Sequence, residues 1–121
     1  MSSEENQIKE VRGLKLYKKK HPTIKKLLKK TSVPEIHGDK VWFSSYLIMD
    51  YLDENPPAKK SNIIEIGCGW GILAIHCAKV FKTNMVAVDA DKNVFPFLEK
   101  HAELNNTKVT SKVSRYETLK S

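Results

Sequence analysis

Cysteine is scarce in this chain, whose 121 residues include only Cys68 and Cys77. The two thiols lack the paired spacing of a structural zinc site, and two cysteines do not make a disulfide framework. We therefore expect no metal centre and no disulfide. Such cysteine usage is typical of a protein kept in the reducing cytoplasm.

Long apolar runs are also missing. No stretch approaches the roughly 20 consecutive apolar residues that cross a bilayer, so the sequence predicts no membrane span. The first residues, MSSEENQIKE, are polar and acidic. This composition differs from the basic and apolar start of a secretory signal peptide, and we expect none.

Glycine is equally sparse, with five residues, yet three of them alternate at positions 67, 69 and 71. An apolar run ending in Glu65 precedes them, and an amphipathic segment follows. A second apolar run, Met85 to Val88, ends in Asp89. The order predicts a strand, a glycine loop, a helix, a second strand and an acid at its tip. Such a loop allows a close approach to a nucleotide-like ligand, and the acid can accept hydrogen bonds from ribose hydroxyls.

The spacing of the glycines discriminates between ligands. A dinucleotide fingerprint would require a third glycine at position 72, where Ile72 stands. A P-loop would require Gly-Lys-Ser/Thr after the loop, which is absent. S-adenosylmethionine has no phosphate but offers a carboxylate, an ammonium and a ribose. Glu65 could hold the ammonium side, directly or through water, and Asp89 the ribose.

These motifs resemble those of the class I, Rossmann-like S-adenosylmethionine-dependent methyltransferases. Residues 65–71 look like the first motif of that family and residues 86–91 like its second, within a match from Ile63 to about Asn106. The resemblance implies S-adenosylmethionine as cofactor and S-adenosylhomocysteine as product. It also implies that Gly67, Cys68 and Gly69 lie under the methionine part, that Gly71 of the same loop belongs to the cofactor-binding residues, that Asp89 binds the ribose, and that Ala90 lies near the adenine. A glycine loop that only packs a helix onto a strand is the structural alternative.

Upstream, residues 36–42 precede an amphipathic segment, Ser44 to Glu54. This arrangement resembles the branch of the family related to small-protein and lysine methyltransferases, in which a tryptophan precedes the helix that leads into the first strand. The resemblance implies that Trp42 flanks the cofactor. The alternative is that Trp42 covers the edge of the core, as large aromatic residues often do.

The expected fold is α/β: a Rossmann-like parallel sheet of which only the first three strands are encoded, preceded by N-terminal helices. Residues 1–40 would form a basic helical extension, with helices over Ile8 to Lys20 and Pro22 to Lys30. Residues 41–121 would form a partial S-adenosylmethionine-binding domain. We expect Leu47, Ile48, Tyr51 and Leu52 to form the buried stripe of one helix. The first strand, Asn62 to Ile66, should be covered on both faces, and His101 should lie on an exposed helical face.

The resemblance also implies a sheet of seven strands with the first strand central, whereas this chain reaches only the third. Its first strand would then present an open edge. A longer protein, a homodimer or second chain, or the N-terminal residues could cover that edge. Family members often carry an acid after the third strand; Arg115 stands at that place here, and Glu117 follows two positions later.

Most of the positive charge lies in residues 1–40, which hold 11 Lys or Arg and 5 Asp or Glu. The Lys-rich segment 15–30 could bind nucleic acid, but with only Tyr17 among its lysines a solvated helix face is the favoured interpretation. The sequence therefore predicts a methyltransferase with an unassigned acceptor and no assigned catalytic residue. A non-catalytic binding module and a basic nucleic-acid-binding protein are the alternatives.

Overall fold

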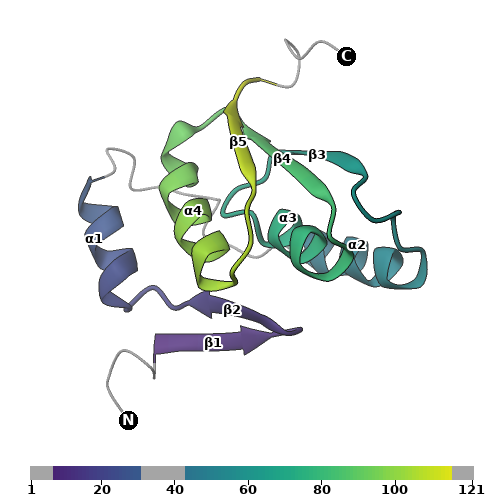
Figure 1. The fold of residues 1–121 in the computed structure, drawn as a ribbon. Helices are drawn as coiled ribbons and strands as arrows, with labels where there is room; N and C mark the ends of the chain where they lie inside the picture. Colours follow the sequence, from purple (N-terminus) through teal and green to yellow (C-terminus); the bar gives the residue numbers. More distant parts are fainter. Residues whose placement is uncertain (1–6, 31–42, 116–121) are drawn as a thin grey trace.

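A computed structural model describes residues 7–30 and 43–115, with side chains from Ser45 onward in the second range (Figure 1). The described elements follow the chain in this order: β1 (Ile8–Val11), β2 (Leu14–Tyr17), α1 (Pro22–Lys30), α2 (Phe43–Glu54), β3 (Asn62–Ile66), α3 (Ile72–His76), a π-helical turn η3 (Cys77–Phe81), β4 (Asn84–Asp89), a 3-10 turn η4 (Lys92–Val94), α4 (Phe95–Leu104) and β5 (Thr110–Val113).

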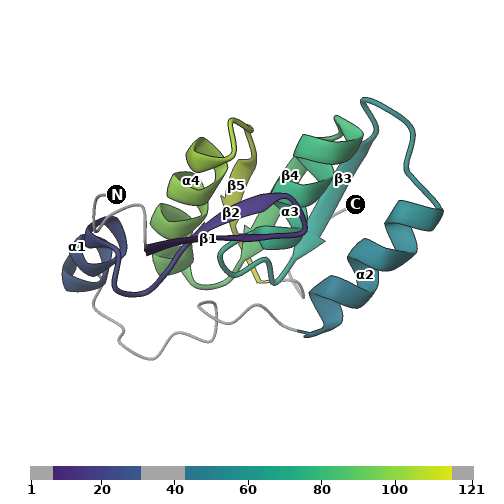
Figure 2. The same ribbon diagram turned by 90° about the horizontal axis from the view of Figure 1, so that it is seen from below.

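The central feature is a parallel sheet in the order β3-β4-β5. Asn62 pairs with Asn84 at the start of the β3–β4 ladder, and Val86 pairs with Thr110 at the start of the β4–β5 ladder. Helices α3 and α4 connect successive strands and lie on one face of the sheet, and the β1–β2 hairpin lies across these helices (Figures 1 and 2). The strand–helix–strand repeat confirms the predicted Rossmann-like α/β fold.

The expected helix over Ile8 to Lys20 is wrong, because this segment forms the β1–β2 hairpin. Arg12 and Gly13 connect the strands, with φ angles of 53° and 80°. Two consecutive positive φ angles are typical of the tight turns that match the twist of a hairpin. Leu14 and Leu16 are buried while Lys15 between them is exposed, so the buried positions have the period of a strand. The helix from Pro22 to Lys30 is confirmed.

Side chains of α4 bind the open edge of the hairpin. The Asn105 amide accepts a hydrogen bond from the Lys15 backbone N–H and donates one to the Lys15 carbonyl, both at 2.8 Å. The Tyr17 N–H donates to His101 Nε2 at 3.1 Å, and His101 Nδ1 lies 2.8 Å from the Phe97 carbonyl. His101 is thus buried, and the expectation of an exposed His101 is wrong. Without these bonds, β2 would have unpaired polar groups against the helix layer.

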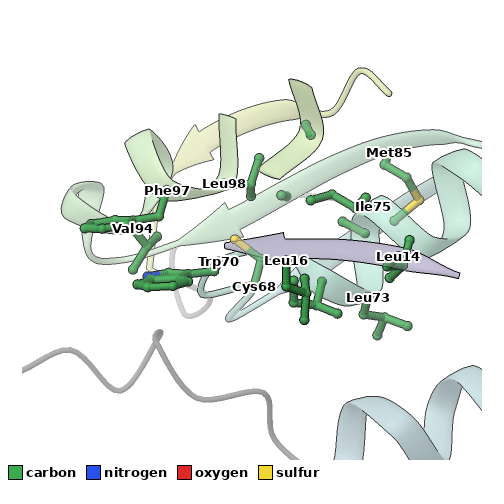
Figure 3. Packing of buried hydrophobic residues seen from close by; sticks show 14 of the residues in the cluster. Leu14, Leu16, Cys68, Trp70, Leu73, Ile75, Met85, Val94, Phe97 and Leu98 are labelled. Carbon is green, nitrogen blue, oxygen red and sulfur yellow. The ribbon is translucent and has the colours of Figure 1, made fainter. Parts of the chain in front are cut away.

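The core fills the space between the sheet, the helices and the hairpin (Figure 3). Phe97 of α4 stacks on Trp70 with ring centroids 4.6 Å apart and the planes 3° from parallel. Leu16 of β2 and Ile75 of α3 belong to the same buried cluster, so the hairpin contributes to the domain's core. The described hairpin therefore contributes side chains to the core of the α/β layers.

Helix α2 has a different buried face from the one expected. Met49 is fully buried, whereas Leu47, Ile48 and Tyr51 are 54%, 44% and 64% exposed. The expected stripe is therefore wrong, except that Leu52 packs against the core. Arg12 links the hairpin to this helix through a salt bridge with Asp50, and its guanidinium lies 4.9 Å from the centroid of the Tyr46 ring. This ion pair holds the pKa of the Asp50 carboxyl below its usual range.

The second face of the sheet is open among the described residues. Ile64 and Ile66 of β3 are 61% and 53% exposed, and Val113 of β5 is 55% exposed. The expectation that β3 is covered on both faces is therefore wrong for the part of the chain that the structure describes. The other edge of β3 carries no strand within residues 7–30 and 43–115. No helix in these residues is long and apolar enough to cross a membrane.

We expect His101 to make the hairpin contact sensitive to pH. Burial lowers the pKa of His101 from its ordinary value of 6.5, so the unfolded chain binds a proton more readily than the folded chain. Its contribution to the free energy of unfolding should be complete above about pH 7 and should decrease as the pH falls through 6.5. Urea unfolding between pH 7.5 and 5 measures this dependence.

His101→Phe is the matching variant. At pH 7.5 it should be less stable by about 2 kcal/mol, because the Tyr17 N–H loses its acceptor. Its stability should depend less on pH between 7 and 5 than that of the wild type, because the titrating group is gone. Two pH curves that run parallel would contradict the proposed role of His101.

Candidate cofactor site

The loop between β3 and α3 is a tight turn built on three glycines. Gly67, Gly69 and Gly71 have φ angles of 72°, 54° and 78°. All three lie in the left-handed region, which is strained for residues that carry a Cβ. Glycine therefore occupies every second position of this loop because the backbone has a positive φ angle at each of those positions.

Hydrogen bonds tie this loop to the end of β4. The N–H groups of Gly67 and Cys68 donate to the Val88 carbonyl at 2.7 and 3.1 Å, and the Gly69 N–H donates to Asp89 Oδ2 at 3.0 Å. Asp89 Oδ1 accepts from the Asp91 N–H at 2.9 Å. The structure thus brings together the loop and the acid that the sequence singled out. These loop N–H groups are used within the protein, so a ligand would contact the loop chiefly through its Cα surface and carbonyls.

Asp89 still has capacity for a ligand. A carboxylate offers about four lone-pair sites, and the described contacts use two of them. Asp89 is half-buried, so part of the carboxylate is open to solvent. These properties suit an acceptor for two neighbouring hydroxyls, although they also give Asp89 a structural role that the sequence did not reveal.

Glu65 is the half-buried acid of the site, with its Oε1 buried. It lies on β3 two residues before the first loop glycine, and its Oε1 has no hydrogen-bond partner among the described residues. Burial, opposed by a backbone hydrogen bond from Ala74 and assisted by the negative charge of Asp89, raises the pKa of Glu65 to about 8. A buried carboxyl oxygen without a partner is costly, and a hydrogen-bond donor at Oε1 would relieve that cost.

Two glycines in the loop differ in their surroundings. A Cβ on Gly71 would lie 2.6 Å from Leu98 Cδ1, whereas a Cβ on Gly67 would meet no atom within 4 Å. Gly71 therefore allows α3 to pack closely on α4. Gly67 borders open space beside the loop.

The other site residues lie as follows. Cys68 is buried, with its Sγ 3.6 Å from the Gly69 carbonyl, and burial raises its pKa to about 12. Such a thiol stays protonated at neutral pH and is a poor nucleophile. Ala90 is exposed beside Asp89, and Asp91 caps η4 by accepting from the Asn93 N–H. Trp42 and Glu117 lie outside the described residues, and Arg115 is exposed at the end of the second described range.

Trp70 is a residue of this site that the sequence reasoning missed. It lies between two loop glycines, is 7% exposed, and stacks on Phe97 of α4. This contact fixes the loop to the helix that follows β4. A bulky aromatic residue between two glycines is the signal that could have identified it, because such a side chain needs a buried place.

Two other features bear on catalysis. His76 is buried, and its Nε2 lies 3.1 Å from Asp53 Oδ1 on α2, so it links α3 to α2. No group of three His, Cys, Asp or Glu side chains that could hold a metal ion occurs within residues 7–30 and 43–115. The described residues therefore suggest a site that binds and positions ligands without an evident general base.

Comparison with known proteins supports this description. A family model described as lysine methyltransferase matches residues 20–120. The ribosomal protein L11 methyltransferase of Polynucleobacter necessarius subsp. necessarius (strain STIR1) is 30% identical over 67 residues, which are 55% of this chain and 20% of that protein. The enzyme of the same name from Thermotoga petrophila is 32% identical over 71 residues, 59% of this chain and 25% of that protein. The chain thus matches a quarter or less of the length of these relatives.

The parallel sheet, the glycine loop and the acid beside it define a class I, Rossmann-like S-adenosylmethionine-dependent methyltransferase fold. Within that class, the family model covers most of the chain, and the chain belongs to the lysine methyltransferase family.

The two loop glycines should respond differently to alanine. Gly71→Ala should cost about 3 kcal/mol of stability, because it combines left-handed strain with a clash against the fully buried Leu98. Gly67→Ala should cost only about 1 kcal/mol, because its Cβ has room and only the strain remains. Urea unfolding of the two variants measures the difference, and equal losses would show that the Leu98 contact is unimportant.

Glu65 should make stability fall as the pH rises. The unfolded chain releases this proton near pH 4.5, whereas the folded chain retains it to about pH 8. The contribution of Glu65 is therefore complete below pH 4.5 and declines up to pH 8. At pH 8, Glu65→Gln should be more stable than the wild type by an amount on the order of 2 kcal/mol, with a smaller difference at pH 5. A constant difference would contradict the raised pKa.

Proposed function

We propose that this chain forms the S-adenosylmethionine-binding part of a methyltransferase that modifies a lysine side chain of a protein. The observation that carries the proposal is the juxtaposition of the glycine loop, the spare acceptor capacity of Asp89 and the unpartnered Oε1 of Glu65. The family description supports lysine as the acceptor, and the matched relatives are named as methyltransferases of a ribosomal protein.

In this proposal the carboxylates share the recognition of the cofactor. Asp89 accepts hydrogen bonds from the ribose hydroxyls, and Glu65 faces the ammonium of the methionine part. The backbone of Gly67, Cys68 and Gly69 lies below the same part. Gly71 sets the start of α3, Ala90 lies beside the adenine, and Trp42 flanks the cofactor from outside the described residues.

The protonation state of Glu65 is coupled to this binding. With a pKa of about 8, Glu65 is mostly protonated at pH 7 in the protein alone. A neighbouring ammonium favours the ionised carboxylate and lowers that pKa. Binding at pH 7 should therefore release a proton, and Oε1 gains the partner that it lacks within the described residues.

Bound S-adenosylmethionine supplies a methyl group already activated on its sulfonium. The protein's contribution is then to hold the acceptor nitrogen in line with that methyl group and to limit the access of water. A lysine acceptor must arrive as the neutral amine, which requires loss of a proton. The described residues assign no base to that step, so we place acceptor recognition outside them.

The open face of the sheet bears on the same proposal. Ile64 and Ile66 are exposed on this face of β3. β3 is also an edge strand of the described sheet, and an uncovered edge strand is prone to pair with another chain. We propose that a second copy of this chain covers this edge when the chain is studied alone. The second candidate function is a non-catalytic module. Whether a partner contributes to catalysis distinguishes an active enzyme from such a module.

A nucleic-acid-binding function receives less support. The lysines of α1 (Lys25, Lys26, Lys29 and Lys30) are all exposed, while Ile24 of the same helix is fully buried. This pattern is typical of a solvated helix face packed on a core by its apolar side. The cytoplasmic location is likewise part of the proposal, and the two buried, unpaired cysteines support a reducing compartment.

Calorimetric titration with S-adenosylhomocysteine tests the cofactor assignment. Asp89→Asn should weaken binding about tenfold or more, because the amide cannot replace both acceptor oxygens. Glu99→Gln is the control, since it removes an exposed carboxylate of α4. Circular dichroism should confirm that each variant is folded, because Asp89 also holds the loop. Normal binding by Asp89→Asn would exclude the ribose assignment.

Transfer of a labelled methyl group separates the enzyme from the non-catalytic module. Protein from a cell extract supplies acceptors, and the label should appear on lysine after hydrolysis. Binding of S-adenosylhomocysteine without any transfer, in the chain alone and in the presence of extract, would favour the module. Label on another residue type would keep the methyltransferase and exclude lysine as the acceptor.

A further inference from the structure

A basic pocket lies at the end of the sheet where β4 and β5 begin. It has a volume of about 480 Å³. Its walls come from β2, from η3, from the end of α4 and from the segments just before β4 and β5. The glycine loop and Asp89 lie at the opposite end of the sheet, where β3 and β4 end. Because β4 has six residues, the two ends are about 20 Å apart. The pocket is therefore distinct from the proposed cofactor site.

The charge of the pocket is of one sign. Four lysines line it, Lys15, Lys79, Lys82 and Lys108, and none of its lining residues is acidic. Lys79 Nζ donates to the Gly13 carbonyl at 2.9 Å, which holds one ammonium in place without neutralising it. Glu10 is the cross-strand neighbour of Lys15, so one carboxylate lies on the hairpin near this wall. Several ammonium groups around one hollow repel one another, and an anion would relieve that repulsion.

The wall that carries these lysines is rigid. The Asn105 side chain is buried and uses its amide for β2, and it also donates to the His101 carbonyl at 2.8 Å. The Thr107 N–H donates to the Ala102 carbonyl at 2.9 Å. Lys82 and Asn106 have φ angles of 57° and 54°, so each segment makes a sharp turn at the pocket. A site with a fixed backbone loses little conformational entropy when a ligand binds.

Thr83 provides an observation independent of the charge. It lines the pocket, is 6% exposed, and its Oγ1 is buried without a hydrogen-bond partner in the described part of the chain. A buried hydroxyl without a partner is costly in a native structure. Since Oγ1 has almost no accessible surface, the lysines would make the first contacts. A rotation of the Thr83 side chain toward the pocket would let a ligand oxygen held by the lysines accept a hydrogen bond from this hydroxyl.

We propose that this pocket binds the phosphate group of a small phosphorylated molecule. Lysine binds phosphate as a point charge, and four lysines line this pocket. The volume exceeds that of one phosphate and leaves room for the group attached to it. The site lies away from the cofactor loop, so the inference does not depend on the proposed methyl transfer.

Pyrophosphate is the probe, titrated by calorimetry at constant ionic strength. We expect saturable binding, together with changes in the amide NMR signals of Lys82, Thr83 and Asn106. The double variant Lys82→Gln/Lys108→Gln should bind at least about tenfold more weakly, since two of the four charges are lost. The matched control is Lys25→Gln/Lys26→Gln, which removes two exposed lysines of α1 outside the pocket. Equal weakening in both variants, or no saturable binding, would overturn the proposal.

Thr83→Val separates a binding role from a structural one. Valine keeps the shape and removes the unpaired hydroxyl, so the free protein should unfold at an equal or higher urea concentration. Pyrophosphate binding should nevertheless weaken several-fold. A variant that binds like the wild type would show that Thr83 takes no part in the site.

Two further arms identify the source of the phosphate. A phosphorylated sugar should bind at least as well as pyrophosphate, and an unphosphorylated sugar should not bind. If a single-stranded RNA binds while pyrophosphate and the phosphorylated sugar do not, the pocket is part of a nucleic-acid surface and the proposal is wrong. Titration of the lysine variants with S-adenosylhomocysteine should give wild-type affinity, which keeps a failure here separate from a failure of the cofactor assignment.

Discussion

The carboxylate of Asp89 is the contact on which the arrangement of the cofactor site depends. It accepts one hydrogen bond from the glycine loop and one from the segment that leads into α4. Asp89, at the end of β4, is therefore connected both to the loop that follows β3 and to the segment that follows β4. A residue that holds the loop and also faces the ligand couples binding to the local fold. For this reason a loss of affinity at Asp89 can be interpreted only together with a measurement of folding.

The sequence predicted the central part of the fold because its signals there are local. The strands Asn62–Ile66 and Asn84–Asp89 appear as short apolar runs, and the glycines between them mark the turn. The conjunction of Asp89 with the loop was also predictable, since neighbouring parallel strands end at the same edge. The hydrogen bonds of the loop were not predictable in this way. They depend on the register of β3 against β4, which spacing alone does not determine.

The failures have a common physical origin, because they concern which face of an element is covered. Leu47, Ile48 and Tyr51 were assigned to the core because they are apolar, yet α2 buries Met49 instead. Likewise β3 exposes Ile64 and Ile66, although its apolar sequence suggested cover on both sides. The hairpin was missed because the alternation of Leu14 and Leu16 is short and lies among lysines. The pair Arg12–Gly13 was the available turn signal.

The two ends of the sheet differ in their chemistry. At the carboxyl ends of β3 and β4, the carboxylate of Asp89 and the mostly protonated carboxyl of Glu65 lie near the loop glycine Gly67, on which a Cβ would meet no atom within 4 Å. At the amino end, four lysines surround a hollow, and the buried hydroxyl of Thr83 lacks a partner among the described residues. The Asn105 side chain joins this end of the sheet to the hairpin, because it hydrogen-bonds the backbone N–H and the backbone carbonyl of Lys15. Lys15 also lines the pocket. The hairpin is therefore part of the core, where Leu16 belongs to the same cluster as Cys68 and Trp70 of the glycine loop, and part of the basic pocket.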